Sequence, residues 1–158
     1  EQALQSALEA ARWSPSASNT QPWRFIVARR GSASHAAVVE SLLGFNRAWA
    51  ADAAALVVFV ATTEQDGKEL RWATYDVGQA AAHFTVQAHA NGLSTHQMGG
   101  FRPADIASAF DLAADQRAVT VMAVGPLGDI DSASDDLRAR EEAPRERRPV
   151  AESILVDD

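Results

Sequence analysis

The chain has 158 residues, of which 47% are hydrophobic and 22% are charged. This composition is typical of one globular domain and excludes wholesale disorder. The absence of cysteine excludes a disulfide scaffold, a thiol nucleophile, an iron–sulfur cluster and a cysteine zinc site. Lys and Arg number 14 against 21 Asp and Glu, for a net charge of −7. We therefore expect no nucleic-acid partner, because phosphate neutralisation needs a basic face.

The sequence carries no visible signal for a membrane or for export. No apolar run approaches the roughly 20 residues that span a bilayer, and no signal peptide is present in the chain. We expect a cytoplasmic protein without a membrane partner. Helical periodicity already begins at the first residues, so we also expect further residues to precede Glu1.

The first half of the chain alternates between helical and extended patterns. Apolar residues near the start recur at helical spacing and form one stripe. Pro15 ends this helix, because proline disfavours helical geometry in the residue before it. A polar loop of small residues follows as far as Pro22. We expect helices over 2–13 and 34–43, and strands over 23–28 and 54–61.

The second half continues the alternation and ends in a different composition. We expect helices over 70–90 and 103–110, and strands over 93–98 and 118–125. From about 127 to 158 the chain is acidic, then rich in proline and arginine, which predicts an arm leaving the globule. The whole of 1–158 is therefore expected to be a single layered domain, α/β or α+β, with a C-terminal arm. Periodicity alone does not order the strands.

The familiar catalytic constellations are missing. The sequence contains no Gly-x-Ser-x-Gly elbow, no phosphate-binding P-loop and no Gly-x-Gly-x-x-Gly after a strand. None of the four histidines pairs at the i, i+4 spacing of a helical zinc site. We therefore expect no metal and no nucleophilic side chain.

The loop before the first strand has two interpretations. Its Ser, Asn and Pro residues are common in turns, and Trp23 could simply anchor the strand. The same loop also offers hydroxyls, amides and backbone N–H groups on a rigid surface, which suits a planar polar ligand. The residues alone leave both interpretations open.

Three matches, in order along the chain, share one resemblance; the second comprises the two ends of the long helix and the turn after it. The loop 14–23 reads Ser-Pro-Ser-Ala-Ser-Asn-Thr-Gln-Pro-Trp, and Tyr75-Asp76-Val77-Gly78 opens the long helix that Asn91-Gly92-Leu93 closes. Met98-Gly99-Gly100-Phe101 follows that helix, and Arg147-Arg148-Pro149-Val150 lies near the end. These segments resemble the FMN-dependent nitroreductase family, whose loop typically reads Ser-Pro-Ser-Ser-x-Asn-x-Gln-Pro-Trp. The matches extend from about 11 to 150, nearly the whole chain.

The resemblance implies a fold and a cofactor. It implies an α+β, three-layer α/β/α sandwich with a mixed central sheet, assembled as an intertwined homodimer with FMN at each of two interfaces. The implied cofactor-binding residues are Pro15, Ser16, Ala17, Asn19, Met98, Gly99, Gly100, Arg145, Arg147 and Arg148. The resemblance implies no catalytic side chain, because flavin N5 accepts the hydride, with the Gly100 N–H nearby. The three arginines would bind the phosphate of FMN. A solvated basic tail is the alternative for these arginines.

The chain also departs from the family in three places. Ala17 replaces a frequent Ser, Gly99 stands where some relatives carry Glu, and the Arg-Arg-Ser type motif that usually precedes the first helix is not in the sequence.

The function that the resemblance implies is hydride transfer from NADH or NADPH through FMN to a small-molecule acceptor, nitroaromatic or quinone, by a ping-pong mechanism. The alternative is a flavin- or ligand-binding protein of the same fold without turnover. The small-residue face of the long helix suits either a dimer interface or an ordinary core.

Overall fold

The structure is a computed structural model that describes residues 1–156. The chain divides into two compact units, Glu1–Leu127 and a second that begins at Gly128. The division falls where the composition changes.

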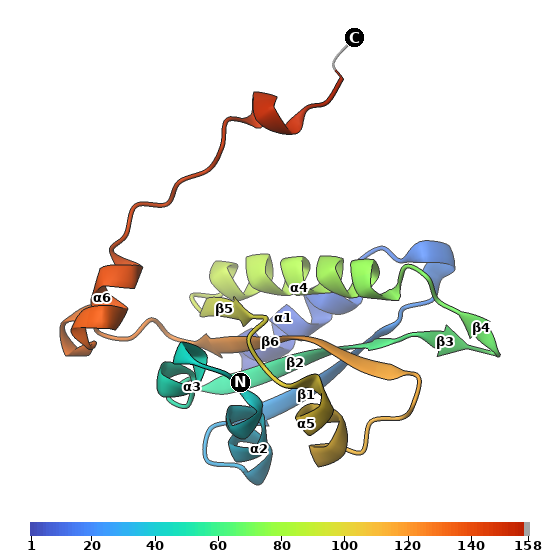
Figure 1. The fold of residues 1–158 in the computed structure, drawn as a ribbon, viewed down its shortest axis with the longest axis horizontal. Coiled ribbons are helices and arrows are strands. Elements are labelled where there is room, and N and C mark those ends of the chain that lie inside the picture. The colour runs from blue at the N-terminus through green and yellow to red at the C-terminus, as the bar shows by residue number, and fades with distance from the viewer. Residues whose placement is uncertain (157–158) are drawn as a thin grey trace. The chain divides into compact units, whose positions relative to one another are not determined.

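A four-stranded sheet forms the centre of the first unit (Figure 1). The strands lie in the order β1 (Trp23–Arg29), β2 (Ala55–Thr62), β6 (Gln116–Gly125) and β5 (Ser94–Met98). Strand β2 is buried at seven of its eight positions because helices cover both faces. All three neighbouring pairs are antiparallel. A mixed sheet needs at least one parallel pair, and these four strands contain none.

One layer of helices consists of α1 (Gln2–Arg12) and α4 (Ala73–Ala90). Small residues such as Ala7, Ala80 and Ala81 are fully or almost fully buried, which lets the two helices approach closely. Their core extends to the sheet through an edge-to-face series of aromatic rings: Phe25 and Phe59 at 5.3 Å, then Phe59 and Phe84 at 5.6 Å. This layer fixes where α4 begins, and therefore where the polar loop is held.

The opposite layer consists of α2 (Ala33–Ser41), α3 (Phe45–Ala50) and α5 (Pro103–Ala109). A second buried cluster joins these helices to the other sheet face through residues such as Val38, Leu42 and Ile106. Helices thus cover both faces of the sheet (Figure 1). The three-layer α+β architecture expected from the sequence is confirmed.

One helix and one hairpin of the first unit were not expected from the sequence. Helix α3 follows Gly44, whose φ of 55° turns the chain sharply after α2. A short hairpin, β3 (Glu64–Gln65) and β4 (Lys68–Glu69), occupies part of the expected loop before α4. No helix within residues 1–156 is both long enough and apolar enough to cross a membrane.

The second unit has little secondary structure. It contains two short 3-10 segments, Ile130–Ser132 and Val150–Ser153, and one helix, α6 (Asp135–Glu141). Ser134 caps α6 by accepting a hydrogen bond from the Leu137 N–H at 3.3 Å. From Glu141 to Val156 every residue is exposed. The segment therefore has no core of its own.

Candidate functional site

The polar loop between α1 and β1 is anchored to helix α4 at two points. The Ala17 N–H donates to Asp76 Oδ2 at 3.1 Å, and the Asp76 side chain is almost fully buried. Ser14 Oγ and His83 Nδ1 lie 2.6 Å apart, with the donor set by the imidazole tautomer. Both partners, Asp76 and His83, belong to α4, so packing of α4 on the sheet determines where the loop sits.

The loop holds a backbone conformation that its residues do not favour alone. Ser18, Asn19 and Gln21 have φ values of 51°, 56° and 48°, in the left-handed region, which Asn tolerates but which costs other non-glycine residues roughly 1–2 kcal/mol each. Ser16 Oγ accepts from the Gln21 N–H at 3.1 Å and closes the turn. Asn19 and Pro15 remain exposed. The anchors thus hold a strained loop that presents polar groups to the outside.

A charged cluster lies immediately before this loop. Arg12 and Trp13 both donate to the Glu9 carboxylate, at 2.6 and 2.8 Å. These bonds lower the pKa of Glu9 from 4.5 to about 2, and the bond from Arg12 makes the largest contribution. The contact therefore stabilises the folded chain above pH 4.5, and this contribution is lost as the pH falls toward 2.

We expect the NMR chemical shift of the Trp13 indole N–H to change with pH as Glu9 is protonated, with a midpoint near pH 2. A midpoint near pH 4.5 would contradict the contact between Trp13 and Glu9.

The second predicted segment is a tight turn after β5. The Phe101 N–H donates to the Gly99 carbonyl at 3.1 Å, an i to i+2 bond that fixes the direction of that carbonyl. In a trans peptide the N–H points opposite to the C=O, so the direction of the Gly100 N–H is fixed as well. Within residues 1–156 the Gly100 N–H donates to no acceptor. The Gly100 N–H is thus an oriented donor without a partner within residues 1–156.

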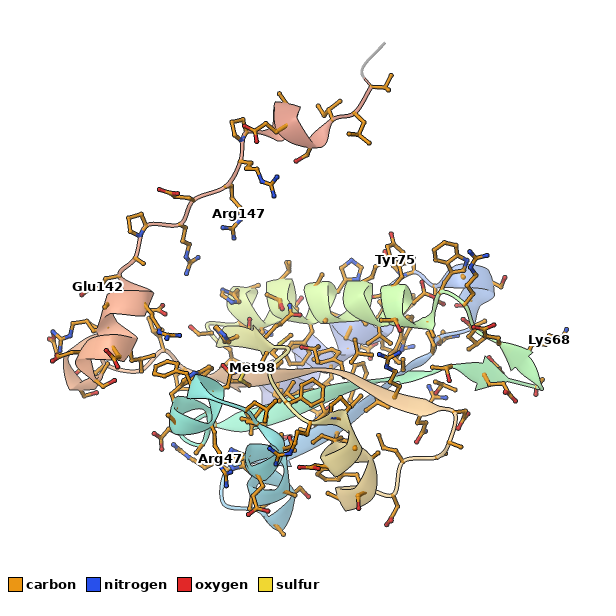
Figure 2. All side chains as sticks on the ribbon, in the orientation of Figure 1. Arg47, Lys68, Tyr75, Met98, Glu142 and Arg147 are labelled. Carbon is orange, nitrogen blue, oxygen red and sulfur yellow. The ribbon has the colours of Figure 1, made fainter. Side chains whose placement is uncertain are left out.

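The glycines in this turn face different surroundings. A Cβ on Gly99 would meet nothing within 4 Å, whereas a Cβ on Gly100 would lie 2.9 Å from Asn46 Nδ2. Met98 is buried in the core beside the turn (Figure 2), and its carbonyl accepts from Thr120 Oγ1 at 3.1 Å. Only backbone atoms of Met98 could therefore reach a ligand, while Gly99 offers an open surface.

The loop and the turn belong to opposite layers of the molecule. The loop is bonded to α4, whereas the Gly100 carbonyl is bonded to Leu43 and Asn46 in the α2–α3 segment. No hydrogen bond or ion pair joins the two segments within the described part of the chain. Arg145, Arg147 and Arg148 lie exposed in the second unit. Within the first unit, the loop and the turn are therefore held by different helices and are not bonded to each other.

Comparison with known proteins gives this arrangement a family. The model of the Nitroreductase family matches residues 1–48 and 32–126. The chain belongs to the Nitroreductase family. A curated relative, an uncharacterized 15.4 kDa protein from Mycolicibacterium smegmatis named for its position in the ask 5′ region, is 36% identical over 134 residues, covering 78% of this chain and 88% of the relative.

Solved structures agree with the family assignment. A crystal structure described as an oxidoreductase containing FMN has a TM-score of 0.90 at 33% identity, over 98% of this chain and 80% of that one. A protein of Desulfovibrio desulfuricans solved in complex with FMN has a TM-score of 0.79 at 21% identity, over 100% of this chain and 85% of that one. The second likeness shows the nitroreductase fold alone.

Sequence reasoning identified the segments of this nitroreductase-family chain but not the residues that hold them. Asp76 was noted as part of a motif without a role, although a carboxylate in the first turn of a helix is well placed to accept a loop N–H. His83, which the sequence did not assign to a metal site, contacts Ser14 and so anchors the loop. Asn46 gave no signal, because α3 itself was not predicted.

Proposed function

We propose that this chain binds FMN and passes hydride from NADH or NADPH, through the flavin, to a nitroaromatic or quinone acceptor. The observation that carries the proposal is the oriented Gly100 N–H, which donates to nothing within residues 1–156. Family membership and the 33% identical FMN-containing oxidoreductase support it. Oriented backbone donors at an open surface suit the polar edge of a flavin, which carries hydrogen-bond acceptors.

The residues present fit FMN. When bound, FMN supplies the hydride chemistry at its N5 atom. The Gly100 N–H is the donor assigned to N5, and the bare Gly99 lets the ring approach the backbone. Asn19 and Ser16 offer an exposed amide and a hydroxyl for the rest of the ring and its ribityl chain. Ala17 contributes no side-chain bond, and its N–H is already used by Asp76.

The proposed site requires two copies of the chain. The loop lies on the α1–α4 layer and the turn on the α2–α3–α5 layer, so we propose that the loop of one protomer faces the turn of its partner. The outer face of α4 exposes Tyr75, Gly78, Ala82 and Val86, and Tyr75 points away from the fold (Figure 2). Small residues among exposed apolar ones suit close packing of two helices in a homodimer.

The phosphate of FMN needs cationic partners. Arg145, Arg147 and Arg148 are the residues proposed for this role, because all three are exposed in an acidic chain. In this arrangement the chain's groups bind and orient the flavin, and none acts as a nucleophile. NADH or NADPH and the electron acceptor would occupy the same open face of the flavin ring one after the other, which is the basis for ping-pong kinetics.

The decisive experiment uses the purified chain incubated with FMN. We expect a yellow dimer that retains one FMN per chain, bleaches when NADH or NADPH is added without oxygen, and recovers its colour with a quinone. A chain that stays colourless after gel filtration overturns the proposal. Retained FMN that neither NADH nor NADPH reduces supports the alternative of a flavin-binding protein without turnover. Retained FMN on a monomer overturns the two-copy site but not FMN binding.

A further inference from the structure

The segment that contains helix α3 binds the carbonyl of Gly100, the residue whose N–H is free. The Gly100 carbonyl accepts two hydrogen bonds, from the Leu43 N–H at 2.9 Å and from Asn46 Nδ2 at 3.4 Å. The first bond belongs to a backbone bridge between Leu42 and Phe101. The second is the one side-chain bond made to the turn by residues 1–156.

These bonds act on the Gly100 N–H through two successive peptide groups. Asn46 and Leu43 hold the Gly100 carbonyl, which lies in the same rigid plane as the Phe101 N–H. That N–H bonds to the Gly99 carbonyl, whose own plane contains the Gly100 N–H. Fixing the first plane therefore fixes the second, and the direction of the Gly100 N–H depends on both groups that hold the Gly100 carbonyl, the Leu43 N–H and the Asn46 amide.

Helix α3, which carries Asn46, is itself held by packing. Trp49, one turn later in α3, packs edge-to-face against His96 of β5, with ring centroids 5.0 Å apart. Ala50, the last residue of α3, is fully buried. The helix is thus attached to the strand that leads into the turn as well as to the turn itself. A group that must aim a donor is best carried by an element held in this way.

We propose that Asn46 is a positioning residue that aims the Gly100 N–H at flavin N5, an inference that rests on the proposed function. An N–H donor at N5 favours oxidised flavin, in which N5 is an acceptor, over reduced flavin, in which N5 carries a hydrogen. Loss of the Asn46 bond therefore lowers the affinity for oxidised FMN relative to reduced FMN. We expect a ratio change of about fivefold, which raises the two-electron potential by about 20 mV.

The variants separate hydrogen bonding from packing. Asn46→Ala removes the amide, whereas Asn46→Asp keeps its shape and replaces the donor by an acceptor that faces the Gly100 carbonyl. Asn91→Ala is the matched control, because Asn91 Nδ2 also donates to a backbone carbonyl at 3.4 Å, that of Ala3, away from the turn. Each variant is compared with the wild-type chain with and without FMN.

Two readouts are used, neither of them turnover. The first is the flavin potential of the FMN-loaded protein. The second is amide hydrogen exchange at Phe101 in the flavin-free protein, which reports the bond to the Gly99 carbonyl directly. We expect both Asn46 variants to raise the potential and to speed Phe101 exchange several-fold, with Asn46→Asp at least as strong as Asn46→Ala and Asn91→Ala unchanged.

The possible failures are distinguishable. A wild-type chain that retains no FMN overturns the proposed function, and the positioning role with it. FMN bound normally, with wild-type potential and wild-type Phe101 exchange in both Asn46 variants, overturns the positioning role alone. Wild-type behaviour of Asn46→Asp beside a defect in Asn46→Ala assigns Asn46 to packing and also overturns it.

Discussion

Replacing Asp76 by Ala is expected to lower the free energy of unfolding by about 1.5–3 kcal/mol, the usual value for a hydrogen bond to a charged group, and to weaken FMN binding at least tenfold. The Asp76 carboxylate holds the Ala17 N–H at 3.1 Å. Without it, the segment with left-handed Ser18 and Asn19 loses the bond that ties it to α4. The loop then relaxes, and the exposed groups proposed to contact the flavin no longer converge.

The matched control is Asp76→Asn. Its amide oxygen can still accept from the Ala17 N–H, while the negative charge near the start of α4 is lost, at a cost of about 0.3–1 kcal/mol. We expect Asp76→Asn to retain most of the stability and FMN affinity that Asp76→Ala loses. Urea denaturation and quenching of FMN fluorescence measure the two quantities. Equal defects in both variants would show that charge, rather than the loop anchor, is what Asp76 supplies.

Local sequence was sufficient to predict most elements and the segments of the candidate site. The β2 run is apolar on both faces, which matches a central strand covered by two helical layers. The loop 14–22 and the turn at Gly99 and Gly100 were found because their residue types suit tight backbone geometry and resemble a family pattern. What these segments have in common is that their signal lies within a few adjacent residues.

The remaining features depend on contacts between distant parts of the chain. Asp76 and Ala17 are 59 positions apart, and Asn46 and Gly100 are 54 apart, so no local pattern records either bond. Helix α3 is only six residues long, too short to show helical periodicity in the sequence, and it is stabilised by tertiary packing. The hairpin is different: Asp66 and Gly67 have φ values of 53° and 73°, and the Asp-Gly pair is a turn signal that the sequence does contain.

Replacing Gly100 by Ala is expected to cost about 1–3 kcal/mol of unfolding free energy, the range for an added group in a filled space, and to abolish tight FMN binding. The backbone at Gly100 is not in the left-handed region, so alanine is permitted there by φ and the effect is steric. Its Cβ would lie 2.9 Å from Asn46 Nδ2. Either the amide rotates away and releases the Gly100 carbonyl, or the turn shifts. Both outcomes move the Gly100 N–H.

Two further variants identify the cause. Gly99→Ala, whose Cβ meets nothing within 4 Å, is the control for folding and is expected to keep the wild-type unfolding free energy. In the double variant Gly100→Ala with Asn46→Ala the obstructing amide is gone, so the two substitutions together should cost less than the sum of each alone. FMN affinity should recover at most to that of Asn46→Ala alone, because the Gly100 N–H still lacks the Asn46 amide that aims it. Strict additivity of the two stability changes would mean that Asn46 is not what the added methyl meets.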